Sequence, residues 1–385
     1  MTGYTIRGTL VTPFELISGG QVEVTDGTIS YAGPRRATAG RVIDHTADLI
    51  CPGFIDLHVH GGGGFDTMDP DPEALNQLSM HLAAGGVTGF LPTTHTASKE
   101  ELEAALCRVE AAQRTGTPGA QVLGAHVEGP FISPERKGAQ DGDHVRPATE
   151  QELEALYMAS AGTMRIMTLA PEAEGALKAV EWLEERGVVA AAGHTDASYE
   201  EALRAFDRGI THLSHFYNGM RGLHHREPGI VGAGLTDGRV NLELVADGVH
   251  VHPATLRLAV LARGPAKIAL VSDSVKHGGL PDGEYSFGGR TVHVMGRSIT
   301  LDRGVIAGSG IRLNEAVRTM VEDAGAALTE AVQMASNTPA RILKLTPRKG
   351  RLEEGSDADI TVLDWGYRVL RTIVGGETVY EARRP

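Results

Sequence analysis

The stretch that says most about the fold of this chain is PGFIDLHVH, residues 52–60. The apolar run Ile55–His60 is short enough to be a buried strand. His58 and His60 are two residues apart, so the alternation of a strand points both side chains to the same side, with Asp56 beneath them. Imidazole together with carboxylate suits zinc or another first-row divalent ion. The end of this strand is therefore a candidate metal site.

Seven similar apolar runs follow, and helical patterns separate most of them. The predicted strands are Ile55–His60, Val87–Pro92, Val122–Glu128, Met164–Leu169, Val188–His194, Ile210–His215, Asn241–Ala246 and Lys267–Asp273. The predicted helices include Pro72–Ala84, Lys99–Gln113, Thr149–Ser160, Ala176–Arg186 and Tyr199–Asp207. Strands that alternate with helices imply a parallel sheet, and eight strands over roughly 220 residues suit an α/β fold of the (β/α)8 TIM-barrel type.

Both ends of the chain read as short strands separated by turns. These strands are Tyr4–Val11, Gln21–Thr25, Thr28–Tyr31, Arg41–Asp44, Asp359–Leu363, Val369–Val374 and Thr378–Tyr380. We expect a small β-sandwich domain made of residues 1–51 and 346–385, around a hydrolase barrel of residues 52–345. Residues 216–239 have no clear helical pattern and are expected to form a long loop. Residues 285–301 are expected to form an inserted hairpin or pair of hairpins.

The composition argues against several classes of protein. The chain has 385 residues, 41% of them hydrophobic, which is enough for a large core. Its net charge of −13 repels polyanions, so we expect no nucleic-acid partner. Two cysteines make no disulfide framework, no stretch approaches the ~20 apolar residues of a membrane span, and the first residues lack a signal-peptide pattern. We expect a cytoplasmic protein with no membrane partner.

The predicted strand ends carry residue types that bind metals. Glu128 closes the third strand, His194 the fifth, His215 the sixth and Asp273 the eighth. In a barrel of this type the active site lies at these carboxyl ends. Taken singly, each residue has a plainer interpretation: a strand-end histidine often caps a loop, Asp273 can cap a helix, and Glu128 can lie on the surface. Five strand ends with ligand types, counting the first strand, together favour a metal site.

Other features of the sequence carry less information. The run Gly61–Gly64 lacks the Lys-Ser/Thr of a phosphate-binding loop and is expected to turn the chain sharply after the first strand. His81 lies in a helical pattern and is expected to be structural, whereas His95 follows a strand and is a candidate for lining a pocket. Cys51 and Cys107 are interpreted as small core residues.

Several segments resemble a known family. The stretch 52–60 resembles the first-strand signature of the amidohydrolase superfamily, which many of its members share. Five more segments narrow the resemblance: His126–Phe131, Ala192–Thr195, Leu213–Met220, Arg226–Gly229 and Ala246–His250. Together they resemble the N-acetylglucosamine-6-phosphate deacetylase family over nearly the whole chain. The resemblance implies a metal-dependent hydrolase that converts N-acetyl-D-glucosamine 6-phosphate to D-glucosamine 6-phosphate and acetate.

The resemblance also implies how a metal would be held. Glu128, His194 and His215 would hold one divalent metal, and Asp273 would be the catalytic base and acid. Some family members replace the first-strand histidines with amide residues and keep a single metal. This chain retains both histidines, so the resemblance implies one or two metals per subunit, with Glu128 bridging. Zinc is the expected ion, and iron, cobalt, manganese or nickel are alternatives.

A set of substrate-binding residues follows from the same resemblance. These are Ala139 beside the acetamido group, Asn218, Gly219 and His250 near sugar or phosphate, Ile306, Ala307 and Gly308 along the pocket, and Arg226 on the phosphate. In the family this arginine comes from the neighbouring subunit, which implies a homodimer. Gln140 stands where some members carry a histidine, which leaves open the identity of the group that polarises the substrate carbonyl.

A phosphorylated amino sugar needs cations in a chain of charge −13, and the run Arg221–Arg226 supplies them. The plainer interpretation of that run is a solvated basic loop. Three alternatives for the function stay open. An N-acetylgalactosamine-6-phosphate deacetylase or a cyclic-amide hydrolase would share the chemistry, whereas a non-catalytic scaffold of amidohydrolase descent would usually have lost ligands.

Overall fold

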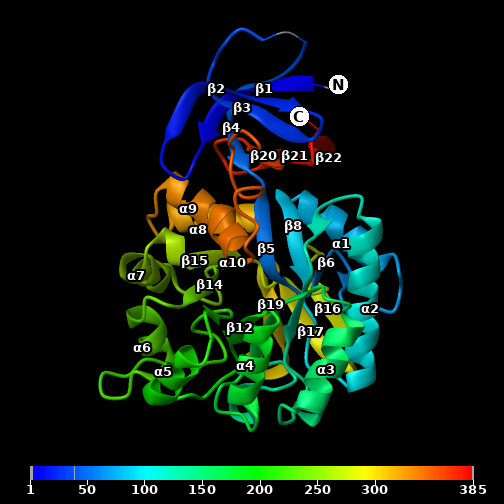
Figure 1. The fold of residues 1–385 in the computed structure, drawn as a ribbon, viewed down its shortest axis with the longest axis vertical. Helices are drawn as coiled ribbons and strands as arrows, with labels where there is room; N and C mark the ends of the chain where they lie inside the picture. Colours follow the sequence, from blue (N-terminus) through cyan, green and yellow to red (C-terminus); the bar gives the residue numbers. More distant parts are fainter. Residues whose placement is uncertain (1–2, 39, 384–385) are drawn as a thin grey trace.

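The structure, a computed structural model, describes residues 3–38 and 40–383. It has two parts (Figure 1): an all-β part that contains both ends of the chain, and a larger part in which helices surround parallel strands. The division follows the two hydrophobic patterns of the sequence, which are short alternating runs at the ends and continuous apolar runs in the middle.

The all-β part is a single seven-stranded sheet. In chain order its strands are β1 (Gly3–Val11), β2 (Leu16–Thr25), β3 (Thr28–Pro34), β4 (Arg41–Pro52), β20 (Ile360–Leu363), β21 (Val369–Val374) and β22 (Glu377–Glu381). They are bonded in the order β22-β21-β20-β4-β1-β2-β3. The sheet folds onto itself, because the backbone N–H of Ala358 donates to the carbonyl of Gly27 at 2.9 Å and residues of β3 and β21, toward opposite ends of the strand order, share one apolar core. The predicted domain from both termini is present as this folded sheet, and its boundaries at residues 51 and 346 stay a prediction.

Two parallel sheets form the barrel. One contains β5 (Phe54–Val59), β8 (Val87–Pro92) and β9 (Gln121–Val122), and the other β10 (Ala125–Glu128), β11 (Met164–Leu169), β12 (Val189–Ala192), β13 (His212–Leu213), β14 (Asn241–Val245) and β15 (Ile268–Val271). They adjoin at both edges: Thr94 N–H donates to the carbonyl of His126 at 3.0 Å, and Asp273 N–H to that of His58 at 2.9 Å. All eight predicted strands are present. The third is interrupted, because Gly124 with φ +140° separates β9 from β10.

Helices cover the outside of these strands (Figure 1). They are α1 (Ala74–Ala83), α2 (Lys99–Thr115), α3 (Glu150–Ala159), α4 (Ala176–Glu185), α5 (Tyr199–Asp207), α6 (Gly229–Thr236), α7 (Pro253–Arg263), α8 (Leu313–Glu322), α9 (Leu328–Ala335) and α10 (Asn337–Ile342), with short 3₁₀ turns at 134–136, 142–144, 265–267 and 302–304. Capping boxes at Ser98 with Glu101 and at Ser198 with Glu201 fix where α2 and α5 begin. Among the described helices, none combines the length and the apolar character that crossing a membrane requires.

The prediction of a helix-free loop at residues 216–239 is wrong, because α6 lies within it. Residues 229–234 of this helix are all buried, so the segment GIVGAGLT has no polar face and lacks the amphipathic period on which the prediction depended.

The prediction for Cys107 is also wrong. It lies exposed on α2, away from the face of Leu102 and Leu106 that packs inward, whereas Cys51 is buried as predicted.

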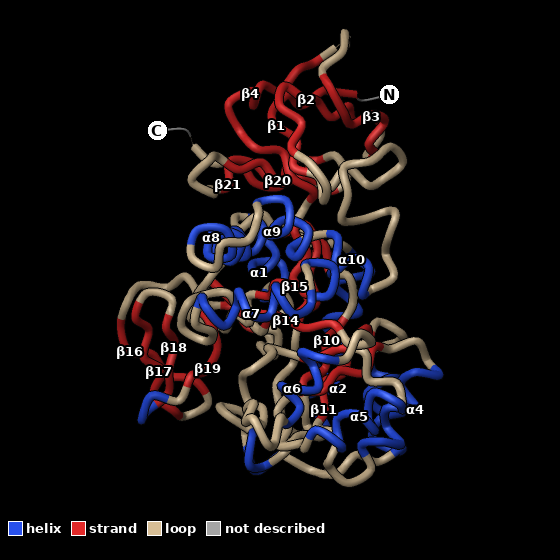
Figure 2. The backbone as a smooth tube through the Cα atoms, turned by 90° about the vertical axis from the view of Figure 1, so that its left-hand side faces the viewer, coloured by secondary structure: helices blue, strands red, loops and turns tan. Residues whose placement is uncertain are grey.

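A four-stranded antiparallel sheet follows β15 and stands beside the barrel (Figure 2). It consists of β16 (Gly283–Phe287), β17 (Arg290–Met295), β18 (Ser298–Leu301) and β19 (Ile306–Ser309). The predicted inserted hairpins are thus confirmed, around a small core of Val292, Val294 and Ile299. A tighter hairpin of β6 (Gly61–Gly62) and β7 (Phe65–Asp66) follows β5. Positive φ at Gly63 and Gly64 makes its turn, so the glycine run bends the chain as predicted.

Candidate active site

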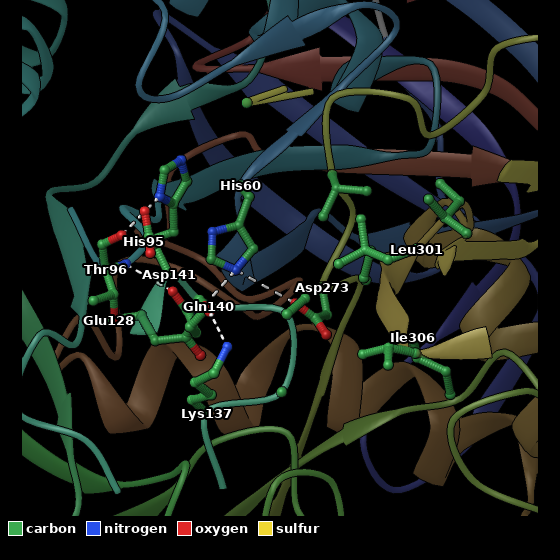
Figure 3. A pocket seen from close by; sticks show the side chains of 18 of the residues that line it. His60, His95, Thr96, Glu128, Lys137, Gln140, Asp141, Asp273, Leu301 and Ile306 are labelled. Carbon is green, nitrogen blue, oxygen red and sulfur yellow. Dashed lines mark hydrogen bonds and ion pairs between the residues drawn. The ribbon is translucent and has the colours of Figure 1, made fainter. Parts of the chain in front are cut away.

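Six of the predicted site residues meet at one end of the barrel, and all are buried: His58, His60, Glu128, His194, His215 and Asp273. His58 and Glu128 lie within strands, and the other four follow the ends of β5, β12, β13 and β15. Figure 3 shows His60, Glu128 and Asp273 pointing toward a common centre. Side chains from five strands therefore converge where a barrel of parallel strands places its active site.

Three of these residues have a left-handed backbone. The φ angle is +47° at His194, +31° at His215 and +48° at Asp273. Residues with a side chain rarely adopt this conformation, which costs on the order of 1–3 kcal/mol and persists where the surrounding structure enforces it. Each of the three lies two residues beyond its strand. The bend turns the side chain from the line of the strand into the mouth of the barrel.

The converging residues form two candidate metal groups. One is His58, His60 and Asp273, and the other is Glu128, His194 and His215. Glu128 faces both groups. Its Oε1 lies 2.9 Å from His215 Nε2 and 3.3 Å from His58 Nε2, and its Oε2 lies 3.4 Å from His60 Nε2. A single buried carboxylate thus joins the two groups.

The Nδ1 atom of each histidine in these groups faces an oxygen acceptor. The distances are 2.9 Å from His58 to Glu243 Oε2, 3.2 Å from His60 to the carbonyl of Thr93, 2.9 Å from His194 to that of Arg136, and 3.0 Å from His215 to that of Asn218. In the neutral ring Nδ1 therefore donates and Nε2 keeps its lone pair. The Nε2 atoms meet in pairs, 3.3 Å apart for the β5 histidines and 3.1 Å for the other two. Facing lone pairs repel unless a cation lies with them, so the residues fit a divalent ion at each pair.

The electrostatics of the site favour metal ligation by Glu128 and His60 and oppose it at His58. Burial alone would raise the pKa of Glu128, but His58 and His194 hold it well below its usual range, so the carboxylate is ionised. Burial lowers the pKa of His60 to about 4, against the opposite effect of Glu128. Burial also opposes charge on His58, but Glu128 and Glu243 outweigh it and hold its pKa well above the usual value. A metal ion at His58 therefore has to displace a proton.

A buried polar network lies beneath the metal groups, and it was not predicted from the sequence. Glu243 of β14 contacts His58 Nδ1 at 2.9 Å and His212 Nε2 at 2.8 Å. His126 of β10 donates from Nδ1 to a β5 carbonyl at 2.9 Å. Two signals point to this network in the sequence. Glu243 is the only charge in the apolar run 241–246, and His126 stands two residues before the glutamate of the metal groups.

The site opens into a cavity of about 980 Å³. It is lined by the predicted residues Ala139, Gln140, Asn218, Gly219, His250, Ile306, Ala307 and Gly308, and by each of the metal-group residues except His58, which lies beneath them. His95 lines the cavity as predicted. A cavity of this size suits a small ligand.

Two polar side chains on the cavity wall are held in fixed orientations. Gln140 Oε1 accepts a backbone N–H from the loop after β8 at 2.7 Å, so its amide N–H₂ faces Glu128, to which it donates (Figure 3). His250 Nδ1 is bonded to Asp247 Oδ2 at 2.6 Å, which leaves Nε2 at 3.8 Å from Asp273 Oδ2. Gln140 therefore presents a nitrogen to Glu128, and His250 presents one to Asp273.

The predicted basic run divides into two parts. Arg221 pairs with Asp196 at 2.5 Å, and the same carboxylate binds Arg136 at 2.7 Å. Arg226 is exposed and does not line the cavity, and its guanidinium lies 2.9 Å from the ring of His225. Arg226 is thus the one predicted site residue that the fold of this chain does not bring to the site.

Comparison with known proteins agrees with this geometry. Residues 49–379 match the model of the amidohydrolase family. The chain is 43% identical over 357 residues to an N-acetylgalactosamine-6-phosphate deacetylase of Escherichia coli O157:H7, which covers 93% of this chain and 94% of that protein. It is 37% identical over 377 residues to an N-acetylglucosamine-6-phosphate deacetylase of Bacillus subtilis, which covers 96% of this chain and 95% of that protein.

Solved structures agree as well. A mutant N-acetyl-D-glucosamine-6-phosphate deacetylase from Mycobacterium smegmatis, in complex with N-acetyl-D-glucosamine-6-phosphate, superposes with a TM-score of 0.92 at 33% identity. The match covers 98% of this chain and 99% of that one. The structure agrees with these matches: it has a barrel, a folded terminal sheet and candidate metal groups at the strand ends. The chain belongs to the amidohydrolase family, in the branch that includes deacetylases of N-acetylated amino sugar 6-phosphates.

Proposed function

We propose that this chain hydrolyses the acetamide of N-acetyl-D-glucosamine 6-phosphate and releases acetate and D-glucosamine 6-phosphate. One observation carries the proposal: four imidazole Nε2 atoms converge on the Glu128 carboxylate beside Asp273, at the base of a cavity that a small ligand can enter. This arrangement suits the hydrolysis of an amide. Further support comes from the deacetylases that resemble the chain over nearly its whole length.

Zinc is the proposed ion, because imidazole and carboxylate together suit it, although iron, cobalt, manganese or nickel can take the same ligands. Glu128, His194 and His215 would hold one ion. His58 and His60 would hold a second, with Glu128 between the two. When bound, a divalent ion polarises the carbonyl oxygen and makes water a better nucleophile at neutral pH.

Asp273 is the proposed general base and general acid. Its Oδ1 lies 3.5 Å from His60 Nε2, so the carboxylate stands beside the metal groups and on the cavity wall. From this position it can take a proton from the attacking water and deliver it to the amine, which leaves very poorly as an anion. The amide N–H₂ of Gln140 offers a donor to the substrate carbonyl as negative charge develops on its oxygen.

Arg226 is proposed to bind the substrate phosphate in the neighbouring subunit of a homodimer. The guanidinium is exposed and lies outside the cavity of its own chain, so it is available to the site of a partner. Its planar fork suits phosphate.

Mixing two impaired variants tests this arrangement. Dimers that combine R226A with D273N should regain acetate release, because one of their sites has both residues. A mixture no more active than its components, although mixed dimers form, contradicts the proposal.

A second candidate substrate is N-acetyl-D-galactosamine 6-phosphate. It is favoured by one observation, the 43% identity to a deacetylase of that sugar phosphate, against 37% to the Bacillus subtilis enzyme. The kcat/KM for acetate release from the two sugar phosphates decides between them. A higher value for the galacto epimer would reassign the substrate.

Changing Asp273 to Asn tests the chemistry that both substrates share. We expect acetate release to fall about 10²- to 10⁴-fold, the range for loss of a general acid–base, while the protein stays folded. Removing the metal with a chelator should abolish acetate release, and zinc should restore it. Activity that persists in both experiments contradicts the mechanism. Freshly purified protein with neither metal nor activity would favour the non-catalytic scaffold.

A further inference from the structure

Glu243 lies in the middle of β14 and is completely buried. Its Oε2 accepts hydrogen bonds from His58 Nδ1 at 2.9 Å and from the backbone N–H of His215 at 3.0 Å. Its Oε1 contacts His212 Nε2 at 2.8 Å. A single carboxylate oxygen therefore contacts one residue of each candidate metal group. The proposed reaction gives Glu243 no part in the chemistry.

His58, His126 and Glu243 also lie close enough to form a third group of metal-ligand type. Their atoms, however, already have hydrogen-bond partners. His126 donates from Nδ1 to the carbonyl of Leu57 at 2.9 Å, and its Nε2 lies 2.7 Å from Thr168 Oγ1. Both oxygens of Glu243 are bonded as well. A network that is satisfied in this way orients its members, so we assign Glu243 to positioning rather than to a third metal.

We propose that Glu243 is a positioning residue that couples the two metal positions, an inference that rests on the proposed metal centre. Through His58, the carboxylate keeps the proton on Nδ1, leaves Nε2 facing Glu128 and His60, and makes the ring a stronger electron-pair donor to a metal. Through the backbone N–H of His215, it holds the bend with φ +31° that aims that ring at Glu128. One charge thus acts on a ligand of each position.

The strand alone does not explain why the charged Glu243 carboxylate lies inside the barrel. All five residues of β14 are buried, and burying a carboxylate is costly unless its partners compensate. The three groups that face Glu243 come from β5, from β13 and from the bend after β13. Two of the three belong to metal-group residues, so the metal centre rather than the strand accounts for a glutamate here.

The test compares two single changes in the full-length protein. E243Q keeps the shape of the side chain and removes its charge, whereas H212Q replaces the one partner that is not a metal-group residue. We expect E243Q to weaken zinc binding about 10- to 100-fold, the usual range for partners of metal ligands. It should also shift the visible absorption bands of the cobalt-substituted protein. H212Q should stay close to wild type in zinc affinity and in the cobalt absorption bands. Zinc affinity is measured by competition with a chelator.

A double-mutant cycle with H58A separates the two routes of the proposed coupling. In H58A the position at Glu128, His194 and His215 remains, and E243Q should weaken zinc binding there as well, because the bend at His215 depends on the carboxylate. If E243Q weakens binding in the wild type but not in H58A, Glu243 serves His58 alone and the coupling is overturned. If E243Q binds zinc like the wild type, the whole inference is overturned.

Thermal unfolding of the metal-free proteins controls for folding. A merely structural role predicts a lower Tm for metal-free E243Q with unchanged zinc affinity, and that result counts against the proposal. Should E243Q fail to fold, E243D takes its place, because it keeps the charge but withdraws it from His58 and His215. The same loss of affinity is expected. Wild-type protein that binds no zinc would defeat the proposed function, whereas equal binding by wild type and variant would defeat only this inference.

Discussion

The two histidine pairs reach the candidate metal centre in different ways. His58 and His60 stand on and just after the regular strand β5, where ordinary alternation aims both rings inward. His194 and His215 lie two residues beyond their strands, on left-handed bends. We call His58 and His60 the strand pair, and its orientation depends only on the position of β5. We call His194 and His215 the bend pair, and its orientation also depends on the loops that hold the two bends.

The orienting partners of the two pairs differ in the same sense. His58 is held by Glu243, a carboxylate inside the barrel, and His60 by the carbonyl of Thr93, directly after β8. The bend pair is held by the carbonyls of Arg136 and Asn218, both in loops, and Asn218 lines the cavity. Metal geometry at the bend pair therefore shares its support with the substrate-binding wall. A change in this wall should therefore weaken metal binding at His194 and His215 and leave metal binding at His58 and His60 unchanged.

Removing the bend pair should have the largest effect. Changing His194 and His215 to Ala takes two of the three ligands from the Glu128 position. Losing that ion removes several kcal/mol of transition-state stabilisation, so acetate release should fall about 10³-fold or more. Kinetic assays with bound-metal analysis check this. A variant that stayed more active than one lacking the strand pair would reverse the proposed ranking.

Removing the strand pair should have a smaller effect. With His58 and His60 changed to Ala, bound metal should drop from two ions to one, because the other three ligands remain. We expect acetate release to fall about 10²-fold, equivalent to about 2.7 kcal/mol. Metal counting on the purified variant is the direct measurement. A stoichiometry unchanged from wild type refutes the second site.

Asp196→Asn tests whether the loops hold the bend pair. Asp196 binds Arg136 and Arg221, and the carbonyl of Arg136 orients His194. Loosening this contact should weaken metal binding at the bend pair about tenfold, the lower end of the range for outer partners, and leave the strand pair unchanged. Zinc titration of D196N in the wild-type and H58A backgrounds measures both positions.

The matched control for D196N is Glu23→Gln, which breaks a comparable ion pair with Arg36 in the terminal sheet. Neither metal position should respond to it. Equal losses of zinc affinity in D196N and E23Q would mean that the effect is general destabilisation rather than support of the bend pair.

The smallest effect is expected far from both pairs. Tyr4 donates from its hydroxyl to the carbonyl of Gly376 at 2.7 Å, so Tyr4→Phe should cost about 1 kcal/mol of stability and leave metal content and acetate release unchanged. Burial raises the pKa of Tyr4 from 10.0 to about 12. The unfolded chain loses the Tyr4 proton first, so the stability that Tyr4 adds relative to Phe should be constant below pH 10 and fall as the pH rises toward 12. Thermal unfolding against pH measures it.

Much of the fold and the position of the site could be predicted from the sequence. Eight apolar runs that alternate with helical patterns indicate a parallel barrel, and such a barrel brings its carboxyl strand ends together. Residue types at those ends, from His58 to Asp273, were therefore enough to place the metal groups. Helix α6 could not be predicted from the sequence. It is buried on every side, so its residues are apolar all round and lack the alternation of apolar and polar faces that marks a surface helix.

The support of the site was much harder to predict. Glu243 is recognisable as a charge within an apolar strand, but its partners His58 and His212 lie on other strands, and only the tertiary fold brings them within hydrogen-bond distance. The left-handed bends at His194 and His215 could not be predicted, because a positive φ is uncommon in any residue with a side chain and most histidines do not adopt it. The proposed role of Arg226 requires a second subunit, and one chain does not describe how two subunits would meet.

The terminal sheet has a consequence for how the barrel closes. Strand β20 pairs antiparallel with β4, with Ile360 opposite Pro52, so the segment that forms the barrel leaves and re-enters the sheet at neighbouring residues. The barrel is complete only when its first and last strands, β5 and β15, meet. Joining the ends of that segment in advance reduces the chain entropy lost when these distant strands find each other. The sheet thus lowers the entropic cost of closing the barrel, and deleting β20–β22 should slow refolding even where every candidate metal ligand remains.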